Sequence, residues 1–160
     1  MGAVAVLVAG VLFWENRYPI EFEKEIELHS RTFGVEAGLV VAVAYAESGF
    51  DKNAVSQKGA VGVMQILPST AQWIAGELER EVFDLTNAST NIEFGCFYLA
   101  YLFEKFDSEI EVLAAYNAGE GNVREWKNGD ELLIEDIPFE ETKNYVKKVL
   151  KLKKYYKNKI

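Results

Sequence analysis

The sequence is poor in the residues that bind metals or form disulfides, with one cysteine, Cys96, and one histidine, His29, in 160 residues. A single cysteine cannot form an internal disulfide, and no pair of Cys or His residues has zinc-site spacing. We therefore expect neither a metal nor any other cofactor. Cys96 lies within an apolar helical pattern, which favours a buried packing role for its thiol.

Basic residues are scarce except near the C-terminus. The chain has 17 lysines and arginines against 25 aspartates and glutamates, a net charge of −8, and from Lys143 onward there are eight lysines and no acid. The acidic body lacks the basic face that phosphate binding requires, so we expect no nucleic-acid partner. The lysine-rich tail has two open interpretations: the solvated face of a terminal helix, or a contact with anionic lipid or wall polymer.

No apolar run reaches the roughly 20 residues that span a bilayer as a helix. The longest run covers residues 2–14, and it lacks the basic flank of a secretion signal. We interpret residues 1–14 as the remaining half of a membrane anchor whose upstream part is absent from this chain. An ordinary buried N-terminal helix is the alternative.

The length and the 49% hydrophobic content are sufficient for one well-buried domain, which we place at residues 15–160. Apolar residues recur at helical spacing, and only residues 61–67 resemble a strand. The predicted helices cover residues 18–33, 39–47, 92–106, 110–116 and 140–150, with a further one starting at residue 68. Without repeats or long linkers, the pattern predicts a mainly α, single compact domain.

Short polar residues mark several of the expected helix ends. Asp84 and Asn91 are the candidate caps before the helix at 92–106, and Ser108 with Glu111 forms a capping-box pattern. The glycine-containing stretch 117–121 predicts a turn after the helix at 110–116. A second irregular loop is predicted over residues 51–62.

Glu47 is the most informative residue, because it ends the most apolar internal run of the chain, residues 39–46. Gly49 is a helix stop signal, so Glu47 is expected at a helix C-terminus. The negative end of the helix dipole and the apolar surround both disfavour an ionised carboxyl, which predicts a raised pKa. A carboxyl with a raised pKa can act as a general acid.

Five motifs follow one another along the chain: Glu47-Ser-Gly-Phe50, Asn53-Ala-Val-Ser56, Gly59-Ala-Val-Gly-Val-Met-Gln65, Ala115-Tyr-Asn-Ala-Gly119 and Glu140-Glu-Thr142. In order and spacing they resemble the soluble lytic transglycosylase domain of the lysozyme superfamily, over about residues 18–152. The resemblance implies a lysozyme-like helical fold, peptidoglycan glycan strands as the partner, and a location in the cell envelope outside the cytoplasm. It also implies non-hydrolytic cleavage after N-acetylmuramic acid, which leaves a 1,6-anhydro ring. We expect a monomer.

The number of carboxylates bears on the mechanism, because ordinary retaining or inverting glycosidases use two. Asp51 is the obvious second candidate here, but an aspartate in this position is more typical of a turn. The resemblance implies that the N-acetyl group of the substrate takes the place of the second carboxylate. Glu47 then donates a proton first and later takes one from the C6 hydroxyl.

The resemblance assigns substrate-binding roles to Ser56, Gln65, Tyr116, Asn117, Glu140 and Tyr145. Gln65 stands among apolar neighbours, where an unpaired amide is costly, and this favours a sugar contact. The alternatives stay open for the others: a turn serine, a packed tyrosine beside a capping asparagine, and a surface glutamate at Glu140. The role of Met64 is also left open.

The sequence departs from the family pattern at Glu120, where the family usually has proline after Asn-Ala-Gly. The substitution brings a negative charge and a freer backbone, which bears on substrate preference rather than on the reaction. Two other functions remain as alternatives. One is a hydrolase of the goose-type lysozyme kind, which needs a competent water, and the other is a non-catalytic peptidoglycan-binding module.

Overall fold

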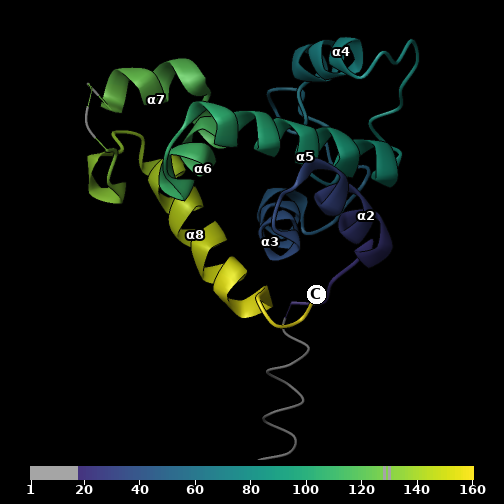
Figure 1. Cartoon of the computed structure of the whole chain (residues 1–160), viewed down its shortest axis with the longest axis horizontal. Coiled ribbons are helices and arrows are strands. Elements are labelled where there is room, and N and C mark those ends of the chain that lie inside the picture. Colours follow the sequence, from purple (N-terminus) through teal and green to yellow (C-terminus); the bar gives the residue numbers. More distant parts are fainter. Residues whose placement is uncertain (1–17, 128, 130) are drawn as a thin grey trace, which may run out of the picture.

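The computed structural model describes residues 18–127, 129 and 131–160 (Figure 1). In these residues the chain is helical, with only isolated β-bridges at Val55, Val61 and Ile66. The helices are α2 (Glu23–Phe33), α3 (Ala37–Ser48), α4 (Pro68–Glu77), α5 (Ala88–Lys105), α6 (Glu109–Ala118), α7 (Glu120–Lys127), the 3-10 helix η1 (Ile134–Asp136) and α8 (Glu140–Tyr156). The predicted mainly α class is therefore confirmed.

The expected anchor segment at residues 1–14 lies outside the described residues. Within the described ranges, no helix combines the length and the apolar composition needed to cross a membrane.

Helix α3 lies at the centre of the molecule, with α2, α5 and α8 packed around it (Figure 1). Its side chains are apolar on every face, and residues 38–44 are all buried. A helix that is hydrophobic all round must be enclosed by other elements, which explains why the most apolar run of the sequence became the central helix. Glu47 is in the last turn of α3, where this central helix leaves the core and approaches the surface.

Glycine and proline set several helix boundaries as predicted. Gly34 (φ 69°) and Gly49 (φ 62°) adopt left-handed backbone conformations directly after α2 and α3. Pro68 opens α4. The start of α2 differs from the prediction, because Phe22 has φ 56° and the helix begins only after it, at Glu23.

The predicted caps of α5 are wrong in detail. The cap is Asn87, whose side chain accepts a 3.0 Å hydrogen bond from the backbone N–H of Thr90. Asp84 instead closes a local turn by accepting from the backbone N–H of Thr86. Asn91 lies one turn inside the helix and is fully buried.

The Asn91 side chain holds the loop before α4 instead of capping a helix. Its amide oxygen accepts a 2.7 Å bond from the N–H of Met64, and its amide nitrogen donates to the carbonyls of Val61 and Leu85. Residues 61–67, the stretch that resembled a strand, form a tight turn with two isolated bridges. A buried amide with backbone partners on both sides therefore fixes this loop against α5.

The expected capping box at α6 is only half formed. The Ser108 hydroxyl accepts from the N–H of Glu111 at 3.3 Å, as predicted. The Glu111 carboxylate does not return to Ser108: it is fully buried and accepts from the N–H groups of Asp107 and Leu132 and from the ammonium of Lys127. It ties the start of α6 to the end of α7 and to the segment before η1.

The turn predicted at residues 117–121 is wrong in extent, because only Gly119 lies outside a helix. Helix α6 continues to Ala118, the single residue Gly119 (φ 90°) separates the two helices, and α7 begins at Glu120. Helix α7 presents Val123 and part of Trp126 to the core and has no other large apolar residue, which left little apolar periodicity to reveal it. Helix α8 also runs further than predicted, to Tyr156.

Candidate active site

Glu47 is partly buried, and its pKa is raised from 4.5 to about 7. The main cause is desolvation, because removal from water disfavours the charged form. Tyr145 and Lys148 oppose the shift: the Tyr145 hydroxyl acts on the carboxylate as a hydrogen-bonding group, and the Lys148 ammonium attracts its charge. The predicted position at a helix C-terminus and the predicted upward shift of the pKa are both confirmed.

Glu47 opens into a cleft of about 680 Å³ between the end of α3, the loop that precedes α4, the end of α6 and the start of α8. Five of the six predicted substrate-binding residues also line it: Ser56, Gln65, Tyr116, Asn117 and Glu140. Segments up to 95 positions apart in the sequence thus meet around one carboxyl. Tyr145 is not part of the lining.

The loop residues Ser56 and Gln65 have structural contacts as well as a place in the cleft. The Ser56 hydroxyl accepts from the N–H of Ala60 at 3.0 Å and closes the turn over residues 56–60. Gln65 has φ 50° and donates both side-chain N–H groups, to the carbonyls of Ala54 and Gly62. Because its nitrogen is fully used, the side-chain carbonyl oxygen of Gln65 is the atom left for a ligand.

Tyr116 connects the end of α6 to the loop. Its hydroxyl donates a 2.8 Å hydrogen bond to the carbonyl of Met64, and its pKa lies well above the ordinary value through burial first and the nearby Glu47 charge second. Met64, whose role the sequence left open, is fully buried. Its backbone, rather than its side chain, therefore links the Asn91 amide to the Tyr116 ring.

Asn117 is oriented by a residue on α8. The Thr142 hydroxyl donates to the side-chain oxygen of Asn117 at 2.8 Å, which leaves the Asn117 amide nitrogen as a donor towards the cleft. Glu140 is exposed at the first residue of α8, where its carboxylate accepts from Asn144 at 3.2 Å. The cleft wall thus offers an amide donor and a carboxylate acceptor.

Tyr145 lies behind the cleft, where its hydroxyl is buried and makes no hydrogen bond of good geometry with the described residues. The hydroxyl is nevertheless close enough to Glu47 to lower the pKa of the carboxyl, and burial raises the pKa of the phenol itself well above its ordinary value. A neutral phenol beside the carboxyl suits a supporting position better than direct contact with a sugar.

Asp51 is outside the cleft. Its carboxylate accepts from the N–H of Asn53 at 2.8 Å, which is a turn contact within its own loop. In the described part of the chain, Glu47 is the one carboxyl whose pKa is resolved as raised. Among these same residues no group of three or more His, Cys, Asp or Glu side chains could hold a metal ion.

Comparisons with known proteins agree with the ordered motifs. Residues 25–135, more than half of the chain, match the family model of the transglycosylase SLT domain. The chain belongs to this family. The SLT domain is 33% identical to the soluble lytic murein transglycosylase of Salmonella typhimurium over 169 residues, which covers 98% of this chain and 26% of that protein.

Two further relatives bear on the fold and on the setting. The crystal structure of an inactive mutant of the lytic transglycosylase Slt from Pseudomonas aeruginosa matches with a TM-score of 0.84 and 31% identity, over 89% of this chain and 25% of that one. The membrane-bound lytic murein transglycosylase C of Glaesserella parasuis is 28% identical, over 81% of this chain and 44% of that protein. The chain thus spans about a quarter of the length of the soluble relatives.

The cleft of this SLT domain also contains residues that the sequence did not single out. Lys58 lines it from the loop, and Phe139, 49% exposed, lines it beside Glu140. Thr142 belongs to the last of the five motifs, so a sequence pattern already indicated that it could lie near the site. Lys58 and Phe139 had none, because an exposed lysine in a loop and an aromatic residue before a helix are common without any function.

Proposed function

We propose that this SLT domain is a peptidoglycan lytic transglycosylase. It cleaves the β-1,4 bond between N-acetylmuramic acid and N-acetylglucosamine without water and leaves a 1,6-anhydro end. The observation that carries the proposal is Glu47, a carboxyl with a pKa of about 7 in a 680 Å³ cleft that contains the polar side chains of the family motifs. Near neutral pH such a carboxyl exists in both protonation states, as a group that alternates between acid and base requires.

In the first step Glu47 donates its proton to the glycosidic oxygen. The bond between this oxygen and the anomeric carbon breaks, and the N-acetyl oxygen of the same sugar stabilises the positive charge that develops on the carbon. In the second step the Glu47 carboxylate takes the proton of the C6 hydroxyl while the C6 oxygen bonds to the anomeric carbon. The proton returns to Glu47, no water is consumed, and one carboxyl is sufficient.

The other cleft residues bind and orient the sugars in this proposal. The Ser56 hydroxyl and the Gln65 carbonyl oxygen face the ring that carries the acetamido group, and the Asn117 amide nitrogen donates to it. Tyr116 provides an aromatic wall that is fixed by its bond to Met64. Glu140 accepts hydrogen bonds from sugar hydroxyls at the rim, and Tyr145 adjusts the pKa of Glu47 from behind the cleft.

Replacing Glu47 by Gln tests the assignment of the reacting carboxyl. The amide keeps the size and a donor but cannot exchange a proton, so release of soluble muropeptides falls by about 10²–10⁴-fold while binding of glycan strands is retained. The mutant of the Pseudomonas aeruginosa relative is described as inactive, which makes the test feasible in this fold. Glu125→Gln, an exposed change on α7, is the matched control. Unchanged turnover in Glu47→Gln would remove Glu47 from its role.

The domain is proposed to work as a monomer in the cell envelope, where its substrate lies. Three exposed lysines, Lys147, Lys151 and Lys154, lie along α8, and exposed Lys157 directly follows it. Lys153 is instead bound to Glu36 and Glu109. The exposed lysines provide a basic stripe that can contact anionic lipid or wall polymer. A membrane-bound relative makes an envelope setting reasonable.

A further inference from the structure

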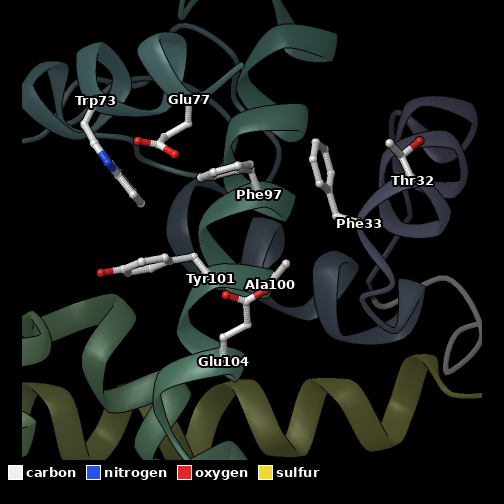
Figure 2. A pocket seen from close by; sticks show the side chains of 8 residues that line it. All are labelled: Thr32, Phe33, Trp73, Glu77, Phe97, Ala100, Tyr101 and Glu104. Atoms are coloured by element: carbon white, nitrogen blue, oxygen red, sulfur yellow. The ribbon is translucent and has the colours of Figure 1, made fainter. Parts of the chain in front are cut away.

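A second hollow, called the outer pocket below, shares no lining residue with the catalytic cleft. It has a volume of about 630 Å³ and lies between α2, α4 and α5 (Figure 2). Aromatic rings and two carboxylates dominate its lining: Phe33, Trp73, Glu77, Phe97, Tyr101 and Glu104. None of these residues belongs to the five motifs.

The aromatic rings of the outer pocket meet edge to face and do not stack on one another. The Trp73 ring meets Tyr101 at 4.8 Å and Phe97 at 5.7 Å, both at an interplanar angle of 67°, and Phe33 meets Phe97 at 86°. Trp73 keeps 37% of its surface exposed. Trp73 therefore combines partial packing against α5 with an apolar surface that is open to a ligand.

A smaller pocket of about 270 Å³ adjoins the outer pocket and lies next to residues that neighbour the catalytic cleft. It shares Trp73 and Tyr101 with the outer pocket and is also lined by Ser69, Tyr98 and Glu120. At its other end Ser69 and Glu120 each lie two residues beyond a lining residue of the cleft, Leu67 and Ala118. The rings of Tyr98 and Tyr116 are 5.4 Å apart. The three hollows are therefore neighbours in the order catalytic cleft, small pocket and outer pocket, with the Tyr98–Tyr116 contact between the first two and Trp73 shared by the last two.

We propose that the outer pocket is a further saccharide-binding site, which holds the part of a glycan strand that extends beyond the catalytic cleft. This inference rests on the proposed function. A polymer that fills the cleft and extends past Tyr116 meets the small pocket next and then Trp73, and this succession of neighbouring hollows favours a glycan strand over an unrelated ligand. The ring faces suit the apolar sides of sugar rings, and carboxylates accept hydrogen bonds from hydroxyl and amide N–H groups.

The two carboxylates of the outer pocket are free to make such bonds. Glu77 and Glu104 are exposed, and in the described ranges neither forms an ion pair. A strand held at both the cleft and the outer pocket gains affinity, because binding at one site raises the effective concentration at the other. The outer pocket therefore acts on long strands and leaves short oligosaccharides unaffected.

The test compares two substrates in three variants. The substrates are a GlcNAc-MurNAc tetrasaccharide, short enough to occupy the cleft alone, and long uncrosslinked glycan strands. Trp73→Ala and the double variant Glu77→Gln/Glu104→Gln remove the two kinds of contact, and Phe103→Ala is the control. Phe103 is an aromatic residue on α5 that is 41% exposed and lines none of the three hollows. The tetrasaccharide rate reports whether each variant is folded.

For long strands we expect kcat/KM to fall about tenfold or more in Trp73→Ala, as for a truncated aromatic anchor, and by a smaller factor in the double variant. The tetrasaccharide rate stays unchanged, and Phe103→Ala changes neither. In the Glu47→Gln background, the Kd for long strands rises by the same factor as kcat/KM falls.

Equal losses on both substrates would place Trp73 in the cleft itself and overturn the outer site. Unchanged long-strand rates and Kd values in both outer-pocket variants would also overturn it. Failure of the proposed function looks different, because the wild-type domain would then release no anhydro product from either substrate.

Discussion

The ammonium of Lys148 on α8 donates a 2.8 Å hydrogen bond to the carbonyl of Ala46, the residue before Glu47. The contact brings a positive charge to the C-terminal end of α3, where the helix dipole is negative. This charge lowers the pKa of Glu47, against the larger effect of burial. Helix α8 thus adjusts the protonation of a carboxyl that belongs to α3.

Replacing Lys148 by Met is expected to raise the pKa of Glu47. In the proposed mechanism the first step needs a protonated Glu47, so kcat/KM is expected to decline as pH rises through a pKa of about 7. In Lys148→Met the decline moves to higher pH, and in Lys148→Arg it stays near the wild-type position. The measurement is the pH dependence of kcat/KM. Lys147→Met, an exposed change at the adjacent position, is the control, and an alkaline limb unmoved in Lys148→Met would refute the prediction.

The raised pKa of Glu47 also makes stability depend on pH. Between the ordinary value of 4.5 and about 7 the folded state binds more protons than the unfolded state, so stability falls as pH rises through this window. Glu47→Gln removes this contribution. Allowing for partial exposure, the wild type should lose about 1 to 3 kcal/mol more than Glu47→Gln between about pH 5 and pH 8. Urea unfolding at the two pH values measures it, and parallel losses in the two proteins would contradict it.

Gly95 on α5 is packed against the Met64 side chain, and a Cβ at this position would overlap the Met64 sulfur. Gly95→Ala is therefore expected to destabilise the domain by about 1 to 3 kcal/mol through overpacking. Activity should fall as well, because the Met64 carbonyl holds Tyr116. In contrast, Gly76→Ala in α4 meets open space and should gain about 0.5 to 1 kcal/mol. Thermal unfolding of the two variants gives the comparison, and equal Tm values would show that Gly95 has room for a side chain.

Asn91→Ala should be among the more destabilising polar substitutions. It leaves the N–H of Met64 and the carbonyls of Val61 and Leu85 without their side-chain partner in a buried setting. The expected loss is about 2 to 4 kcal/mol, since unpaired buried groups cost more than a bond contributes. Asn53→Ala, at an exposed loop position, should cost far less. The measurement is the free energy of unfolding of the two variants in urea. Similar losses for both would argue against the buried role of Asn91.

The parts of the fold that local chemistry determines could be predicted from the sequence. Gly34, Gly49, Pro68 and Ser108 each mark a helix end through their own backbone or side chain. The role of Asn91 could not be predicted, because two of its three backbone partners lie 27 and 30 residues away and exist only in the folded chain. The sequence favoured a capping role because a cap depends only on neighbouring residues, whereas the contacts of Asn91 are tertiary.

The candidate site was predictable to the extent that its residues stand in ordered motifs. Glu47, Ser56, Gln65, Tyr116, Asn117 and Glu140 line one cleft, whereas Tyr145 lies behind it. The periodicity of α8 places Tyr145 on the buried face, but only the packing of α8 on α3 brings it close to Glu47. The outer pocket had no sequence signal, because Phe33, Trp73 and Tyr101 come from three helices and each is also explained by packing.

The most direct test of the central claim is the mass spectrum of muropeptides released from purified peptidoglycan in water enriched in oxygen-18. If the C6 oxygen closes the ring, the products are one water lighter than hydrolysis products, resist borohydride reduction and carry no heavy oxygen. Products with a reducible end that contains oxygen-18 would contradict the account and identify a hydrolase of the goose-type lysozyme kind.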